Sequence, residues 1–109
     1  MFKRYLKTDK ENKFICVNLS YNKGGVNYAT YRNEPRGYYI HVQPVTREIH
    51  GGVTMESFVA FTGYKQLIRE VGRASKKQEK ICDGIALDCA RPIIQRVLEE
   101  SGLKITEEY

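Results

Sequence analysis

The first half of the chain is dominated by a two-residue alternation of apolar and polar positions. In FICVNLSY, residues 14–21, Ile15, Val17 and Leu19 alternate with smaller or polar side chains, which is the period of a half-buried strand. The NKGG segment at 22–25 then offers glycines for a tight reversal, and residues 26–33 (VNYATYRN) resume β-prone chemistry. These patterns predict two strands joined as a hairpin.

A second turn, EPRG at 34–37, leads into a third strand. Pro35 presets φ for the first central position of a turn, and the strand follows from 38 to about 46. Pro44 cannot donate a ladder hydrogen bond, so we expect it near the strand end, at a bulge, or with its nitrogen facing away from a neighbouring strand.

The register of this third strand has two solutions. If the turn closes on Asn33 and Tyr38, Ile40 and Val42 face away from the apolar side of the first strand. A five-residue loop or a bulge would bring the apolar sides together again, and the sequence leaves both arrangements open.

A third reversal is expected over residues 47–52, which end in His-Gly-Gly. The next segment, VTMESFVAF at 53–61, could begin a helix or form a fourth strand. Its apolar residues recur at every second position over most of its length, which favours the strand.

From Thr62 the apolar spacing changes to three and four residues, the period of an amphipathic helix. The pattern predicts one long helix, or two helices broken near residues 72–75. Pro92 favours the first turn of a further short helix, which should stop at Ser101-Gly102. The remaining residues, 102–109, are expected to form a loose tail.

Together these elements predict an α+β fold in which an antiparallel β-meander of three to four strands precedes one long or two shorter helices and a short C-terminal helix. At 109 residues the chain fits one domain, 1–109. Within it we expect a basic leader over 1–13, the meander over about 14–61 and the helical half over about 63–101.

The excess of positive charge suggests an anionic partner such as a nucleic acid. Eighteen Lys and Arg against thirteen Asp and Glu give a formal charge of +5. Such a charge can serve solubility alone. Clustered cations can also neutralise several phosphates at once, and the cations here cluster near the N-terminus and again within residues 69–80.

Three cysteines, Cys16, Cys82 and Cys89, form no CxxC pair and their odd number suits no closed disulfide framework. The N-terminal residues carry no apolar leader segment, and no stretch approaches the roughly 18 apolar residues of a membrane span. We therefore expect a cytoplasmic protein with no membrane partner.

The strand pattern brings a set of side chains to one surface. If the aliphatic strand faces pack on the helices, the opposite face gathers polar and aromatic residues with an arginine at the turn, a surface on which unpaired bases can stack. Tyrosines are equally common as cross-strand partners, and RASKKQEK at 73–80 is either a phosphate-binding flank or a solvated helix face. The candidate nucleic-acid-binding residues are Tyr31, Arg36, Tyr39, His41, Gln43, Arg73, Lys76 and Lys77.

No residue set compels a reaction. Cys82 and Cys89 share a helix face, but structural zinc needs four ligands in close-spaced pairs. Neither His41 nor His50 is spaced to identify a nucleophile that it would activate. Asp83 and Asp88 suit capping or surface roles, so we expect no catalytic residue, no metal and no cofactor.

Three segments, VNLSYNKGGVNY, EPRGYYIHVQPV and SFVAFTGYK, cover about a third of the chain and resemble a group of small uncharacterised proteins from mobile elements and phages of gut bacteria. This resemblance implies a genomic setting and no particular mechanism. The order of four strands before a helix is also similar to the Whirly and transcriptional-coactivator single-stranded DNA-binding proteins, without a residue-level motif.

The resulting hypothesis is a non-enzymatic nucleic-acid-binding module of a mobile element or phage that prefers single-stranded DNA. The long amphipathic helix would supply the core and offer a homodimer seam. The alternative is a protein-binding inhibitor or adaptor that acts on a host defence complex.

Overall fold

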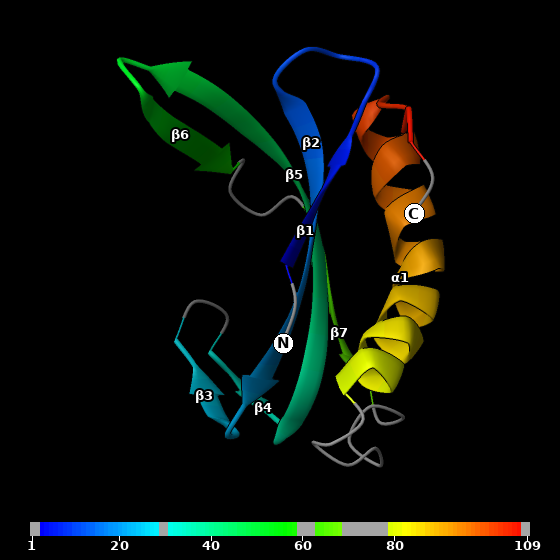
Figure 1. The fold of residues 1–109 in the computed structure, drawn as a ribbon. Helices are drawn as coiled ribbons and strands as arrows, with labels where there is room; N and C mark the ends of the chain where they lie inside the picture. Colours follow the sequence, from blue (N-terminus) through cyan, green and yellow to red (C-terminus); the bar gives the residue numbers. More distant parts are fainter. Residues whose placement is uncertain (1–2, 29–30, 59–62, 69–78, 108–109) are drawn as a thin grey trace.

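The computed structural model describes residues 3–28, 31–58, 63–68 and 79–107, and for 79–83 it describes the backbone only. It is an α+β fold in which one helix lies across a mostly antiparallel sheet (Figure 1). The elements are β1 (Lys3–Lys7), β2 (Lys13–Asn22), β3 (Gly25–Asn27), β4 (Arg32–Glu34), β5 (Gly37–His50), β6 (Val53–Phe58), β7 (Tyr64–Ile68) and α1 (Glu79–Ser101).

The long strand β5 organises the main sheet. Its residues 37–46 pair with β2, and β1 continues the sheet beyond β2. Along the opposite edge of β5, residues 38–42 pair with β7 and residues 45–50 pair with β6. β3 and β4 pair only with each other, as a separate two-stranded ribbon.

The core lies between the sheet and α1. Val17 pairs with Val42 and Leu19 with Ile40, so the aliphatic side chains of both strands share one face, and all four are buried. The helix covers this face with a buried stripe that includes Ala86, Ala90, Ile93, Ile94, Val97 and Leu98. Figure 1 shows α1 along one side of the sheet only.

The structure resolves the register conflict in the sequence and corrects the first hairpin. β2 pairs directly with β5, from Asn22 opposite Gly37 onward. Residues 26–33 are therefore not the second strand of a meander, because β3 and β4 pair antiparallel with each other instead of with β2. This ribbon leaves the apolar faces of β2 and β5 in register.

The N-terminal residues are also more ordered than a basic leader. β1 is an edge strand whose Leu6 is 1% exposed and pairs with Ile15 on the helix side. The third reversal is confirmed at Gly51 and Gly52, which both adopt positive φ, but residues 47–50, expected within it, continue β5. Residues 53–58 form a strand as expected, and 59–61 lie outside the described residues.

The predicted helical half begins with a strand, and the predicted break near residues 72–75 lies outside the described residues. Residues 64–68 form strand β7, where Tyr64 pairs with Val42 and Ile68 with Tyr38. Pro92 lies inside α1 and does not begin a new helix. Proline removes the hydrogen bond to the Asp88 carbonyl, but the buried stripe on both sides of it keeps one continuous helix packed on the sheet.

The C-terminal residues form a clasp on β1 and the β1–β2 turn. Leu103 is 8% exposed and belongs to the core, and Ile105 bridges to Thr8. The Lys104 carbonyl accepts a hydrogen bond from the Asp9 backbone at 2.8 Å, and the Lys104 N–H donates to the Asp9 carboxylate at 3.1 Å. The expected loose tail is thus wrong for residues 103–107. Within the described ranges no helix is long and apolar enough to cross a bilayer.

Candidate functional site

The sheet face opposite α1, called here the open face, contains three of the predicted site residues. In the β2–β5 ladder Tyr39 pairs with Ser20, His41 with Asn18 and Gln43 with Cys16. These side chains alternate with the core residues and so point away from the helix. The prediction that Tyr39, His41 and Gln43 share a face is borne out by this register.

The ring of Tyr39, however, is not open to solvent. Tyr39 is 5% exposed and its hydroxyl donates to the Pro35 carbonyl at 2.7 Å. The Lys65 ammonium lies 4.9 Å from the ring centroid. Tyr39 therefore cannot stack on a base in this arrangement, which corrects the expectation of an accessible ring.

Glu34 connects the β3–β4 ribbon to the main sheet. Its carboxylate accepts hydrogen bonds from the Asn22 amide at 2.6 Å, the Asn27 amide at 2.7 Å and the Lys65 ammonium at 2.9 Å. The hydrogen bond from Asn27, followed by that from Lys65, holds the pKa of Glu34 below its ordinary value. Three elements thus meet at one carboxylate, and the base of the ribbon is fixed.

His41 is half-buried on the open face beside Lys65, its cross-strand partner. Burial, and then the positive charge of Lys65, lower the pKa of His41 below its ordinary value. The lowered pKa favours the neutral imidazole, so His41 is a weaker candidate than a lysine or an arginine for neutralising a phosphate.

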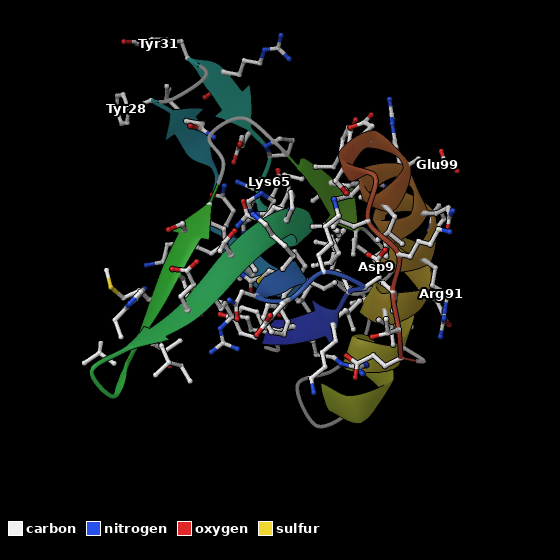
Figure 2. All side chains as sticks on the ribbon, turned by 90° about the horizontal axis from the view of Figure 1, so that it is seen from above. Asp9, Tyr28, Tyr31, Lys65, Arg91 and Glu99 are labelled. Atoms are coloured by element: carbon white, nitrogen blue, oxygen red, sulfur yellow. The ribbon has the colours of Figure 1, made fainter. Side chains whose placement is uncertain are left out.

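Two tyrosines project from the end of the ribbon. Tyr28 is 81% exposed and Tyr31 is 84% exposed, and they stand at either end of the turn between β3 and β4. Figure 2 shows both side chains at the far end of the ribbon, pointing away from α1. We call β3, β4 and these two tyrosines, residues 25–28 and 31–34, the tyrosine arm.

Tyr31 also has a backbone conformation that few side chains adopt. Its φ of 55° lies in the left-handed region, which costs a non-glycine residue roughly 1–3 kcal/mol. Such positions are found at functional sites more often than elsewhere. Tyr28 is a site residue that the sequence analysis missed, because YATY contains neither Gly nor Pro to mark a turn.

Arg36 was expected beside Tyr39, but it contacts Tyr21 instead. Its Nε donates to the Tyr21 hydroxyl, and its guanidinium carbon is 5.9 Å from the centroid of that ring. Tyr21 packs edge-to-face on Tyr38 at 5.2 Å. Arg36 therefore extends the basic surface at the base of the arm and does not join Tyr39.

At the other end of the open face, the positive charges of Lys3 and Arg47 are compensated by the Glu56 carboxylate. Arg47 stacks over Tyr5 at 4.0 Å, and its Nε is 3.1 Å from a Glu56 oxygen, although the N–H does not point at that oxygen. The Tyr5 hydroxyl donates to the same carboxylate at 2.6 Å, and Lys3 lies 4.0 Å from it. These cations are engaged within the protein.

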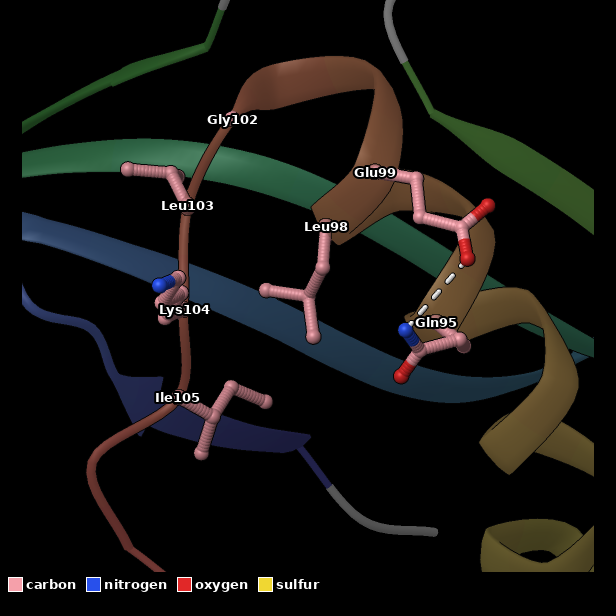
Figure 3. A pocket seen from close by; sticks show the side chains of 7 residues that line it. All are labelled: Gln95, Leu98, Glu99, Gly102, Leu103, Lys104 and Ile105. Carbon is pink, nitrogen blue, oxygen red and sulfur yellow. Dashed lines mark hydrogen bonds between the residues drawn. The ribbon is translucent and has the colours of Figure 1, made fainter.

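A separate hollow of about 460 Å³ lies on the helix side, where the chain leaves α1 (Figure 3). Gln95 and Glu99 form one wall and are joined by a hydrogen bond of 3.4 Å. Leu98, Leu103 and Ile105 form much of the rest. It holds no convergent set of polar groups that would orient a ligand.

Three predicted cations, Arg73, Lys76 and Lys77, lie outside the described residues. The side chain of Cys82 also lies outside them. In the part of the chain that is described, no three His, Cys, Asp or Glu side chains are grouped so as to hold a metal ion.

The site thus consists of an exposed aromatic pair on an anchored arm beside a polar sheet face. Comparison of the chain with protein families, curated proteins and solved structures found no match.

Proposed function

We propose that this protein is a cytoplasmic, non-enzymatic nucleic-acid-binding module of a mobile element or phage, which binds single-stranded DNA through the tyrosine arm. The observation that carries the proposal is the exposure of Tyr28 and Tyr31 on an arm whose base is fixed by Glu34.

Stacking explains why aromatic rings would be displayed in this way. A base stacked on an aromatic side chain contributes about 1–3 kcal/mol, and every base offers a π face, so the interaction tolerates sequence. A ring on an arm that is already ordered loses less conformational entropy on binding than a ring on a loose loop. Two such rings suit unpaired bases better than a duplex, whose bases are already stacked.

The charges around the arm favour an anionic ligand. Residues 22–36 contain the cations Lys23, Arg32 and Arg36 and only one carboxylate, that of Glu34, which is engaged with Lys65. Lys23 and Arg32 are exposed and form no ion pair with any residue that the structure describes. They are free to contact phosphates.

The other predicted residues have supporting roles in this proposal. Tyr39 and Lys65 hold the arm on the sheet, and His41 and Gln43 offer neutral polar contacts next to it. Arg73, Lys76 and Lys77 would add phosphate contacts that are independent of sequence.

The first test is fluorescence anisotropy with labelled single-stranded and duplex oligonucleotides over a range of salt concentrations. We expect the single strand to bind more tightly, with an affinity that falls steeply as salt increases. Tyr28→Ala and Tyr31→Ala should each weaken binding by about 1–3 kcal/mol if one base stacks on each ring.

Matched variants separate stacking from charge. Tyr28→Phe and Tyr31→Phe keep the ring and should bind like the wild type. Arg32→Gln should lower the slope of log affinity against log salt by about 0.7 for a single strand. Gln95→Ala, a change at an exposed position of α1 outside the tyrosine arm, should have no effect. The proposal is wrong if no oligonucleotide binds even at low salt, or if the alanine variants bind normally.

A protein-binding inhibitor or adaptor of a host defence complex is the second candidate. Exposed tyrosines are also common hot spots of protein interfaces, and four exposed apolar side chains on β5 and β6 favour a protein contact. A partner bound by tyrosines without salt dependence, together with no oligonucleotide binding, would support this candidate.

A further inference from the structure

The hairpin of β5 and β6 projects beyond the main sheet. Thr46 is the last β5 residue paired with β2. Beyond it, β6 is the only strand next to β5 among the described residues, and the two remain paired as far as His50 and Val53. Figure 1 shows this hairpin bending away from α1. We call residues 47–58 the apolar arm.

The apolar arm exposes large hydrophobic side chains on both of its faces. Ile49 is 76% exposed and Phe58 43%, and the strand pairing places them on the open-face side. Val53, 63% exposed, and Met55, 56% exposed, lie on the other side. A two-stranded hairpin by itself is only marginally stable in water. Burying the apolar side chains of both faces would lower the free energy of the arm.

The outer strands β1 and β6 differ in how well their edges are protected. β1 carries Lys3, Arg4 and Lys7 in five residues, and lysine-rich edges resist pairing with another strand. β6 has one ionic side chain, Glu56, which already contacts Arg47. No described strand lies along the outer edge of β6. The unpaired backbone groups of this edge can accept another strand.

The charge distribution identifies the partner as a second copy of this chain. Two copies with a formal charge of +5 repel each other over most of their surfaces. The apolar arm is an exception, because it contains Arg47 against Glu48 and Glu56, with His50 2.9 Å from Glu48. Arg47 is paired with Glu56 and His50 with Glu48, so two copies can meet here without opposing unpaired cations and can bury their apolar side chains together.

We propose that β6 pairs antiparallel with β6 of a second copy, about a two-fold axis at Met55, to form a homodimer. In this register Met55 lies opposite Met55 of the partner subunit and Val53 opposite Ser57 of the partner subunit. Thr54 lies opposite Glu56 of the partner subunit, so the two Glu56 carboxylates avoid each other. The contact is closed and symmetric, unlike a β6–β1 contact, which would propagate into filaments.

The helix does not provide the seam in this arrangement. The apolar stripe of α1 is buried on its own sheet, and its exposed positions are mostly polar, as at Gln95, Arg96, Glu99 and Glu100. The dimer contact therefore moves from the predicted helix to a sheet edge.

Light scattering coupled to size exclusion tests the proposal on the whole chain. The wild type should have about twice the 12.6 kDa mass of one chain at high concentration and dissociate on dilution. Met55→Lys places two cations opposite each other and should weaken association by about tenfold or more. Val26→Lys, a matched change at a 50% exposed residue of the tyrosine arm, should leave the dimer intact.

Disulfide cross-linking tests the register and remains informative if Met55→Lys fails to fold. Met55→Cys should form a disulfide-linked dimer under mild oxidation, because opposed side chains in an antiparallel pair have Cβ atoms about 4.5–5.5 Å apart. Val53→Cys should not, because the two Val53 positions would be four residues apart along the strand. A monomer at every concentration, a mass that rises without limit, or equal cross-linking of both variants would overturn the proposal.

Discussion

At the residue scale, the Glu34 carboxylate holds the tyrosine arm to the sheet. Its three hydrogen bonds come from β2, from β3 and from β7. No single strand could position the arm in this way, because a two-stranded ribbon of three residues each is too short to be stable alone.

Glu34 gives the protein a predictable response to acid. A carboxyl whose pKa is lowered by folding stabilises the folded state above its unfolded pKa, and that contribution is lost as pH falls through the folded value. For Glu34 the loss begins near 4.5, the ordinary value, and is complete below its lowered folded value. Glu34→Gln should lower the melting temperature at neutral pH, and its difference from wild type should shrink below pH 4.5.

Thermal unfolding followed by circular dichroism over this pH range provides the measurement. Glu99→Gln is the control, because it removes one negative charge from the exposed surface of α1 without touching the arm. A difference between wild type and Glu34→Gln that stays constant as the pH falls would contradict this role.

At this same scale the sequence predicts which side chains share a face but not which are accessible. Strand alternation places Tyr39, His41 and Gln43 together correctly. The burial of Tyr39 depends on Lys65, which arrives from a strand 26 positions later in the chain. No local pattern contains that contact.

At the element scale, two glycines in different elements should respond oppositely to alanine. Gly63, just before β7, has a φ of +113°, and an added Cβ would lie 2.6 Å from the Val42 carbonyl oxygen. Gly63→Ala should therefore destabilise the fold by roughly 1–3 kcal/mol. Gly84 lies in α1 with nothing within 4 Å of an added Cβ, so Gly84→Ala should stabilise it by about 0.5–1 kcal/mol.

Urea unfolding of the two variants and the wild type measures both effects. The same chemical change is made at each position, so the pair controls for the loss of glycine itself. Equal changes in stability, or a stabilised Gly63→Ala, would show that the close approach of Gly63 to β5 does not constrain the fold.

The strands were partly predictable at this scale. FICVNLSY predicts β2 because its two-residue alternation fits a strand and not a helix. Tyr64, Leu67 and Ile68 fit a helical spacing as well as a strand, and pairing with β5 decides for the strand. The tyrosine arm could not be recognised, because VNYATYRN alternates like one strand although residues on either side of its centre pair antiparallel with each other.

At the scale of the whole molecule, the C-terminal clasp joins the two ends of the described chain. Backbone hydrogen bonds link Lys104 to Asp9 and Thr106 to Lys7, and the Leu103 side chain fills the core beside α1. Leu103→Ala should cost about 2 kcal/mol, at the low end for a buried leucine because the site lies at the rim of the core.

Chemical denaturation compared with Val26→Ala tests this prediction. Val26 is 50% exposed and lies outside the proposed dimer contact, so the control change should leave stability almost unaltered. Equal effects of the two substitutions would mean that Leu103 and the clasp contribute nothing to the stability of the fold. The sequence did not reveal the clasp, since LKITEE is too short and too mixed to show a period.

The pairing of Asn22 with Gly37 has a consequence for the architecture. Because these two residues are already neighbours across the sheet, the fourteen positions between them form an outgrowth whose ends meet. Changes of length or composition at the far end of that outgrowth, between Tyr28 and Tyr31, need not disturb the scaffold beneath it. The display element can therefore diversify while the framework stays the same, much as recognition loops vary on a constant β-sandwich.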